Sequence, residues 1–251
     1  SLPLWLGAFV SPKCKNSVVV ESSYLESTTR GVKGLVKRLY MSRISKVYAS
    51  GRAQQRLVEG LGYSRKVVIT KGVGIFNYDT QPNYEERAEV KRFVYVGRLT
   101  AVKNLKFLIE VFNDIPQYEL TIVGFGELEE SLKSIARDNI RFTGAVENHK
   151  LKDVYRAHDV FILPSYSEPW GLVVEEALNN GLPVLVSDKV GCADEIIREG
   201  ENGFIFPHND KASLLKSIER ICDITTYNAM RQNISQLDFK VIAHKQVECY
   251  L

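Results

Sequence analysis

Short apolar runs alternate with stretches of helical periodicity along most of the 251-residue chain. The apolar runs are rich in Val, Ile and aromatic residues and are bounded by Gly, Pro, Asn or Asp, which predicts β-strands. Between them, apolar residues recur at helical spacing, as at Leu105, Leu108, Ile109 and Phe112. Strands separated by helices predict parallel sheets of the doubly wound α/β class. The predicted strands are Ser17–Val20, Lys46–Ala49, Val67–Thr70, Arg92–Val96, Leu120–Val123, Ile140–Thr143, Val160–Leu163 and Pro183–Val186, with a short extended piece at Phe204–Phe206.

The pattern divides the chain into two α/β units. Residues 78–91 are polar and lack apolar periodicity, which predicts a linker. Residues 92–236 form a complete Rossmann-like unit, and residues 237–251 are expected to form a C-terminal helix. Residues 1–77 hold only about three strands, so we expect them to be the later part of a first domain whose beginning is absent. The apolar start of this part, residues 2–10, is interpreted as a core helix or strand because no basic region precedes it.

Composition narrows the possible functions. There are 33 Lys and Arg against 30 Asp and Glu, a net charge of +3, which argues against dedicated nucleic-acid binding. The four cysteines form no CxxC pair, so neither a zinc site nor a disulfide framework is predicted, and a reducing compartment is the simpler interpretation. No apolar run approaches the ~18 residues of a membrane span. Residues 33–43 predict a basic amphipathic helix, for which a solvated face and peripheral binding to anionic lipid both remain open.

The segment SYSEPWGLVVEEALNNGLP, residues 165–183, carries the strongest candidate chemistry. It follows a predicted strand and leads into a helix beginning near Gly171, whose free N–H groups would suit an anion above the sheet. Glu168 lies in the loop before this helix and Glu176 within it, so the two carboxylates could face opposite ends of one bound molecule. The alternative is that Glu168 caps the helix and Glu176 is a solvated surface residue.

Three further turns follow predicted strands of the same sheet. In YVGRLTAVKN, Arg98 and Lys103 suit a diphosphate, although they could be surface charges. In VGFGE, Gly124 permits close backbone approach or simply a tight turn. In RFTGAV, Gly144 ends a strand where a flat base could lie, or where an ordinary turn occurs. Because the carboxyl ends of parallel strands meet at one edge of a sheet, the shared location makes a ligand site there the favoured interpretation.

Together these motifs resemble the donor-binding domain of retaining glycosyltransferases of family 4, which have the GT-B fold of two Rossmann-like domains. The resemblance covers nearly all of residues 93–207, including the E-x7-E pattern. The matching segments are GRLTAVKN, IVGFGEL, FTGAV, EPWGLVVEEAL and GCADEI.

The resemblance implies a role for each matching residue. Arg98 and Lys103 would hold the donor diphosphate and, with Glu168 beside the transferred sugar, form the catalytic group. Glu176 would bind the ribose hydroxyls of the nucleotide. The other implied donor-binding positions are Gly97, Gly124, Gly144, Val146, Gly171, Leu172 and Val173. Glu21 would lie on the acceptor side, although a turn or helix cap explains it at least as well. Residues 237–251 would form a C-terminal helix that crosses back to the first domain.

The crossover loop departs from the family pattern, and the histidines belong to no recognised motif. In KGVGIF, residues 71–76, Lys71 stands where Asn is common in the family's crossover loop and Gly74 where Asp is common. The four histidines show no spacing typical of metal ligands or catalytic partners.

The sequence thus predicts a glycosyltransferase that moves a sugar from a UDP- or GDP-sugar to a hydroxyl of a glycan, polysaccharide or lipid-linked acceptor, with retention of configuration. The donor would lie in the cleft between the two domains. No metal or other cofactor is expected, because cations and helix amides meet the phosphates and no DxD motif lies near the site. The expected location is the cytoplasm, with peripheral binding at the inner face of the membrane left open. The alternatives are a donor-binding fragment without turnover and, resting on VGFGE alone, an NAD-dependent oxidoreductase.

Overall fold

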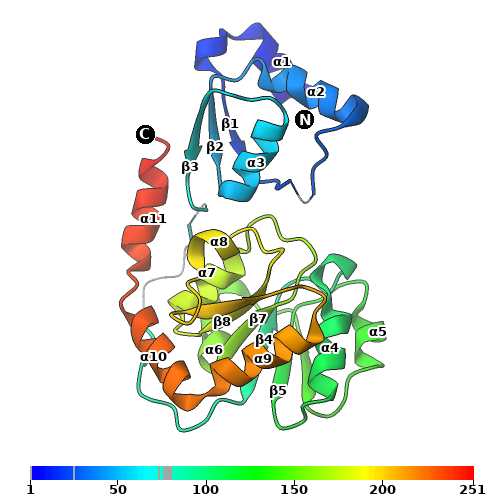
Figure 1. Cartoon of the computed structure of the whole chain (residues 1–251), viewed down its shortest axis with the longest axis vertical. Helices are drawn as coiled ribbons and strands as arrows, with labels where there is room; N and C mark the ends of the chain where they lie inside the picture. Colours follow the sequence, from blue (N-terminus) through cyan, green and yellow to red (C-terminus); the bar gives the residue numbers. More distant parts are fainter. Residues whose placement is uncertain (1, 25, 73, 76–80) are drawn as a thin grey trace. The chain divides into compact units, whose positions relative to one another are not determined.

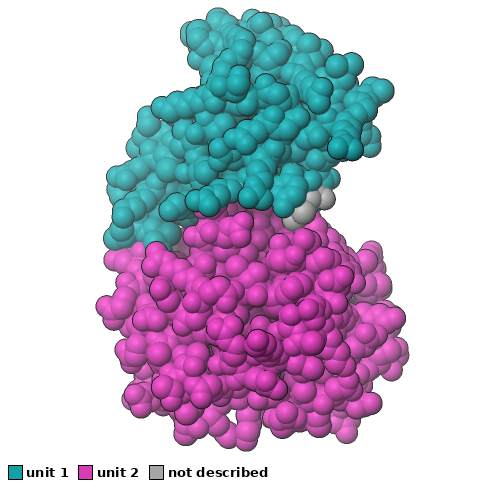
Figure 2. Space-filling model, viewed as in Figure 1, with its two compact units in different colours: residues 1–74, 241–251 teal, residues 75–240 magenta. Residues whose placement is uncertain are grey.

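The computed structural model describes residues 2–24, 26–72, 74–75 and 81–251. They form two compact units, residues 1–74 with 241–251 (unit 1) and residues 75–240 (unit 2) (Figures 1 and 2). Of the predicted linker, residues 78–80 lie outside the described part, and residues 81–91 contain no regular helix or strand.

Unit 1 is built on a three-stranded parallel sheet in the order β1-β2-β3. Its core gathers apolar side chains from the middle strand and the adjoining helices, among them Ile44, Val47 and Leu57. The stacked rings of Tyr48 and Tyr250, with centroids 4.7 Å apart, join the last residues of the chain to this unit. Its elements are α1 (Leu2–Val10), β1 (Ser17–Val20), α2 (Gly31–Met41), β2 (Lys46–Ala49), α3 (Arg52–Gly60), β3 (Lys66–Ile69) and most of α11 (Phe239–Glu248).

The predicted core position of residues 2–10 is wrong in part. They form helix α1, but Leu6 is 59% exposed and Val10 86% exposed. Trp5 packs instead on Tyr40 of α2, with ring centroids 5.0 Å apart. The two helices therefore contact each other while keeping apolar side chains on the surface.

Unit 2 is a six-stranded parallel sheet in the order β6-β5-β4-β7-β8-β9. The buried side chains of its two middle strands are apolar, as expected of a parallel sheet that is covered on both faces. Among them, Phe93, Val94, Phe161 and Ile162 are fully buried. The strands are β4 (Arg92–Val96), β5 (Glu119–Val123), β6 (Ile140–Gly144), β7 (Val160–Leu163), β8 (Val184–Ser187) and β9 (Gly203–Phe206). The helices are α4 (Leu105–Asn113), α5 (Glu129–Lys133), α6 (Leu151–Arg156), α7 (Leu172–Asn179), α8 (Ala193–Ile196), α9 (Lys211–Cys222) and α10 (Ile224–Ser235).

The predicted α/β fold with parallel sheets is confirmed, with small shifts at element ends. Strand β8 begins at Val184 rather than at the predicted Pro183, because proline has no N–H to donate to a neighbouring strand. The short extended piece at residues 204–206 is a full member of the sheet, since β9 pairs with β8 from Gly203 to Phe206.

The strand order contains one topological switch point. From β4 the chain winds outward through β5 to β6, then returns through α6 to β7 on the other side of β4 (Figure 1). Strands β4 and β7 pair directly, with Phe93 opposite Val160. In doubly wound sheets, ligands bind at the carboxyl ends of the strands beside such a point. The loops that follow β4 and β7 are therefore where a site is expected.

Candidate functional site

The two strongest sequence clusters follow the two strands of the switch point. Lys103 comes after β4 and Glu168 after β7, and their side chains form an ion pair. The pair is largely buried, with 13% of the Lys103 side chain and 15% of the Glu168 side chain exposed. The backbone supports the same contact, because the N–H of Tyr166 donates to the carbonyl of Val102 at 2.8 Å. Residues 65 positions apart in sequence thus meet at one point.

The turn that presents Lys103 has a local cause. Residues Ala101–Lys103 form one 3-10 turn, and Asn104 then reverses the chain in the left-handed region at φ 57°. Asparagine tolerates this conformation better than most residues. Its side chain is fixed in turn, because Nδ2 donates to the carbonyl of His208 at 2.8 Å.

Glu168 is held in place by the loop after β8. Its N–H donates to the carbonyl of Lys189 at 3.0 Å, and its carbonyl accepts from the N–H of Gly191 at 2.8 Å. A Cβ on Gly191 would lie 1.8 Å from the carbonyl oxygen of Pro169, so only glycine fits without movement. Both backbone groups of Glu168 are therefore satisfied, and its carboxylate is carried by a fixed loop.

Arg98 lies on the same edge, after β4, and is exposed. Its carbonyl accepts a hydrogen bond of 2.9 Å from the hydroxyl of Tyr95, a fully buried side chain. Burial raises the pKa of Tyr95 strongly, the charge of Glu168 adds to this rise, and the charge of Arg98 opposes it. Both charged groups therefore influence the same phenol.

Helix α7 opens toward the same edge without a side-chain cap. Its N-cap residue, Gly171, has φ 99°, a left-handed conformation that favours glycine, and it provides no side-chain cap for the first amides of the helix. The preceding loop is anchored by Trp170, whose indole N–H donates to Glu175 Oε1 at 2.7 Å. The amides of Leu172 and Val173 thus begin an uncapped helix directly after the loop that carries Glu168.

Glu176 lies further along α7 and is half-buried. Tyr155 of α6 donates its hydroxyl to Glu176 Oε2 at 3.0 Å. Burial raises the pKa of Glu176, and this hydrogen bond opposes the rise. A small cavity, also lined by Asn148 and Lys152, borders both side chains.

Three predicted glycines lie in a row across the ends of β4, β5 and β6. The N–H of Gly97 donates to Val123 at 3.0 Å, and the N–H of Gly124 donates to Gly144 at 2.9 Å. A Cβ on Gly124 would lie 1.8 Å from the carbonyl oxygen of Gly97, so this approach requires glycine. Val146 follows two residues after Gly144 and is half-buried.

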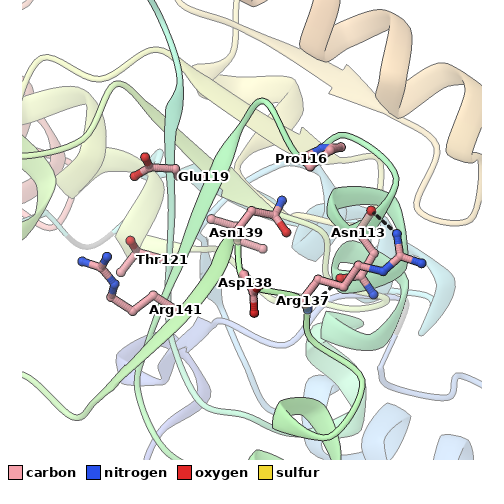
Figure 3. Close-up of a pocket in the computed structure, with 9 residues that line it drawn as sticks. Asn113, Pro116, Glu119, Thr121, Arg137, Asp138, Asn139 and Arg141 are labelled. Carbon is pink, nitrogen blue, oxygen red and sulfur yellow. Dashed lines mark hydrogen bonds between the residues drawn. The ribbon is translucent and has the colours of Figure 1, made fainter.

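A larger hollow of about 480 Å³ lies elsewhere, where β5 and β6 begin (Figure 3). Its two arginines are accompanied by two carboxylates, Glu119 and Asp138. Arg137 donates to the carbonyl of Asn113 at 2.8 Å. With balanced charges and a position at the amino ends of the strands, this hollow is not the predicted phosphate site.

The remaining predicted positions, Glu21, Lys71 and Gly74, belong to unit 1. Glu21 is exposed directly after β1 in unit 1, where its carbonyl accepts from Gln54. In the predicted crossover loop, Lys71 has a left-handed φ of 56° and Gly74 a φ of 82°, while residues 73 and 76 lie outside the described part.

Sequence reasoning missed the residues that support the cluster. Tyr155 bonds Glu176 from 21 positions away, and Gly191 bonds Glu168 from 23 positions away. Neither belongs to a motif with a local chemical signature, although the matching segment GCADEI begins at Gly191. Across the described ranges, no group of three or more His, Cys, Asp or Glu side chains is arranged to hold a metal. In the same ranges, no helix is long and apolar enough to cross a bilayer.

Comparisons with known proteins agree with this architecture. An uncharacterized glycosyltransferase of Methanocaldococcus jannaschii is 29% identical over 73% of this chain and 53% of its own length. A phosphatidyl-myo-inositol mannosyltransferase of Mycobacterium leprae is 28% identical over 79% of this chain and 56% of its own. The crystal structure of Anabaena Alr3699/HepE, in complex with UDP and glucose, shares the fold with a TM-score of 0.73 at 20% identity, covering 92% of this chain and 70% of that one.

This chain spans between half and three-fifths of the length of these two curated relatives. The family model described as Glycosyl transferases group 1 matches residues 79–237, which is more than half of the chain and includes the whole site built around β4, β7 and α7. The chain therefore belongs to the glycosyl transferases group 1 family.

Proposed function

We propose that this protein transfers a sugar from a nucleoside diphosphate sugar to a hydroxyl acceptor. The observation that carries the proposal is the buried Lys103–Glu168 pair at the switch point, beside the uncapped start of α7. Membership of the glycosyl transferases group 1 family supports the reaction class. The relatives named above include a mannosyltransferase and a neighbour bound to UDP and glucose, which supports a nucleotide-sugar donor.

The diphosphate is the part of the donor that this geometry suits best. Transfer breaks the bond between the anomeric carbon and a diphosphate oxygen, and the nucleoside diphosphate leaves with the electron pair. The acceptor oxygen bonds the anomeric carbon and gives up its proton. Arg98, Lys103 and the amides at Gly171, Leu172 and Val173 stabilise the charge that grows on the leaving oxygen.

Glu168 and Glu176 take different parts of the donor in this proposal. Because Glu168 is already paired with Lys103, a diphosphate arriving at Lys103 brings the adjoining sugar to the Glu168 carboxylate. Glu176, about one helical turn into α7 and held by Tyr155, accepts hydrogen bonds from the ribose hydroxyls. Gly97, Gly124, Gly144 and Val146 leave room for the nucleotide against the strand ends.

The finer features of the reaction rest on the resemblance to family 4. They are retention of the anomeric configuration, a UDP- or GDP-sugar as donor, and a glycan, polysaccharide or lipid-linked acceptor. The proposed donor site uses cations and helix amides on the phosphates, so transfer should persist in EDTA. NMR of the product reads the anomeric configuration directly, and an inverted product would reject retention.

A thermal-shift panel of UDP, GDP and their sugars tests the donor site. UDP or GDP should raise the melting temperature of the wild type, because a ligand that binds only the folded state stabilises it. Arg98→Ala should abolish the shift. Arg141→Ala removes the same charge from the exposed edge strand β6 and should keep the shift. An undiminished shift in Arg98→Ala would reject the diphosphate role.

We also propose a cytoplasmic location with peripheral binding to the inner face of the membrane. Helix α2 exposes Val32, Leu35, Val36 and Leu39, with exposed fractions from 45% to 79%. Residues 30–43, which contain this helix, carry five Lys or Arg and no Asp or Glu, so the helix complements anionic lipid.

Sedimentation with vesicles containing phosphatidylglycerol tests this surface. The wild type should sediment with them and Leu35→Asp should not, whereas Val247→Asp, on α11, should behave as the wild type. Equal sedimentation of wild type and Leu35→Asp would reject the surface.

A further inference from the structure

A second cluster of cations surrounds a cavity at the other end of the unit 2 sheet. The cavity has a volume of about 250 Å³ and is lined by Arg87, Arg156 and Arg231, with Asn180 and Tyr227. It borders the residues just before β7 and β8, so it lies at the amino ends of these strands. The proposed donor site lies at their carboxyl ends. The arginines of this cavity and the proposed diphosphate site therefore lie at opposite ends of the strands, although Asn180 lines both this cavity and the small one beside Glu176.

The central cation of this arginine pocket is Arg231. It is only 4% exposed and donates to the carbonyl oxygens of Asn83 and Glu85. These carbonyl dipoles accept from two of its N–H groups but carry no net negative charge. Burial lowers the pKa of Arg231 from its ordinary value, and the charge of Arg87 adds to this effect, while Tyr227, Tyr84 and Asp159 oppose it. A buried cation without a counter-ion is unfavourable, and an anion in the cavity would relieve this.

The other two arginines act on the same space. Arg156 is oriented by Asn180, whose Oδ1 accepts from Nε at 3.0 Å. The guanidinium carbon of Arg231 lies 5.6 Å from the centroid of the Tyr84 ring. Burial raises the pKa of Tyr84, and the charges of Arg231 and Arg156 both oppose that rise. Arg87 is half-buried and lines the cavity from the segment of residues 81–91, which precedes β4.

The lining of the pocket carries no acidic side chain among the described residues. Among the same residues, neither Arg87 nor Arg231 has a carboxylate within 4.0 Å. The nearby carboxylate of Asp159 is already paired with Arg92 at 2.9 Å. The hollow of Figure 3 differs in this respect, because Glu119 and Asp138 accompany its arginines.

We propose that the arginine pocket binds a phosphate group, either as inorganic phosphate or as the phosphate of a small phosphorylated metabolite. Guanidinium groups match phosphate oxygens in a planar, two-pronged geometry. The cavity is about eight times the ~30 Å³ that a water molecule occupies in the liquid, so it admits a phosphate with a small substituent. Because Arg87 belongs to residues 81–91 while Arg156 and Arg231 belong to α6 and α10, a bound phosphate would fasten this segment to the two helices.

Calorimetric titration of the full chain tests the site. The probes are inorganic phosphate and glucose 6-phosphate, each with and without saturating UDP, at constant ionic strength. Binding to the wild type should survive UDP, because the proposed diphosphate site lies at the opposite ends of the strands. Stronger binding of inorganic phosphate would identify the free anion as the ligand, and stronger binding of the sugar phosphate a metabolite.

Two variants locate the binding. Arg87→Gln removes one half-buried cation without touching the hydrogen bonds of Arg231, and should weaken binding about tenfold or more. Arg141→Gln makes the same change in the hollow of Figure 3 and should leave binding unchanged. No binding to the wild type, displacement by UDP, or equal binding by Arg87→Gln would overturn the proposal. Since UDP binding is measured separately, failure here leaves the donor site untouched.

Discussion

Individual residues at the switch point are fixed by neighbours that are distant in sequence. Glu168 takes its backbone partners from Lys189 and Gly191, and its side-chain partner is Lys103. These hydrogen bonds and the ion pair hold the Glu168 carboxylate in one position, because the neighbouring backbone packs closely against its loop. This closeness makes the site sensitive to single atoms added nearby.

Gly191→Ala tests that sensitivity. The added Cβ would lie 1.8 Å from the carbonyl oxygen of Pro169, so the loop must shift. Such overpacking costs roughly 1–3 kcal/mol. We expect a lower melting temperature and weaker UDP binding. Gly7→Ala is the control, because its Cβ meets nothing within 4 Å. Unchanged stability and UDP binding in Gly191→Ala would show that the loop is not held as described.

Glu176→Gln tests the buried carboxylate of α7. Burial, opposed by the Tyr155 hydrogen bond, raises the pKa of Glu176, so folding favours its neutral form. The stability that this preference contributes is present below the unfolded pKa of about 4.3 and is lost as pH rises through the higher folded pKa. Gln keeps an acceptor for Tyr155 and stays neutral.

The variant should therefore be at least as stable as the wild type at pH 7, with its advantage shrinking toward pH 4, while its affinity for UDP falls. Thermal melts at the two pH values and a UDP titration measure these effects. A variant less stable than the wild type at pH 7 would contradict the role of burial.

At the scale of elements, one carboxylate joins the beginnings of the two central strands. Asp159, 2% exposed and just before β7, accepts hydrogen bonds from the N–H groups of Lys91 and Arg92 and from the Arg92 guanidinium. Burial alone would raise the pKa of Asp159, but these hydrogen bonds lower it below its ordinary value. Its stabilising effect is therefore present above the unfolded pKa and lost as pH falls through the folded one.

Asp159→Asn should destabilise the protein by roughly 1.5–3 kcal/mol at pH 7, because it weakens hydrogen bonds to a charged group. The difference from the wild type should shrink below about pH 4. Denaturant unfolding at several pH values measures it, with the exposed Asp138→Asn as the control. A difference that stays constant down to pH 3 would mean that the charge of Asp159 is not what stabilises these strands.

The accuracy with which the sequence predicts the fold differs from one helix or strand to another. Short continuous apolar runs predict β4 and β7 correctly, because strands that are buried on both faces need apolar side chains at successive positions. The same rule misplaces α1 in the core, since apolar composition cannot tell a buried face from an exposed one. The motif residues Lys103 and Glu168 are predictable, whereas Tyr155 is not, because its role depends only on tertiary packing.

At the scale of the whole molecule, the sheet of unit 2 separates two groups of cations. Arg98 and Lys103 follow β4, and Arg87, Arg156 and Arg231 surround the opposite ends of the strands. A net charge of only +3 hides this arrangement, since overall composition says nothing about where charges gather. Local charge, rather than total charge, determines where a phosphate would bind.

Calorimetric titration of UDP tests the central claim most directly, namely that Arg98 and Lys103 hold one diphosphate beside the start of α7. Arg98→Ala and Lys103→Ala should each weaken UDP binding about tenfold or more, because each removes a charged hydrogen-bond donor from the phosphates. Arg141→Ala should bind UDP as the wild type does. Wild-type affinity in either Arg98→Ala or Lys103→Ala would contradict the account.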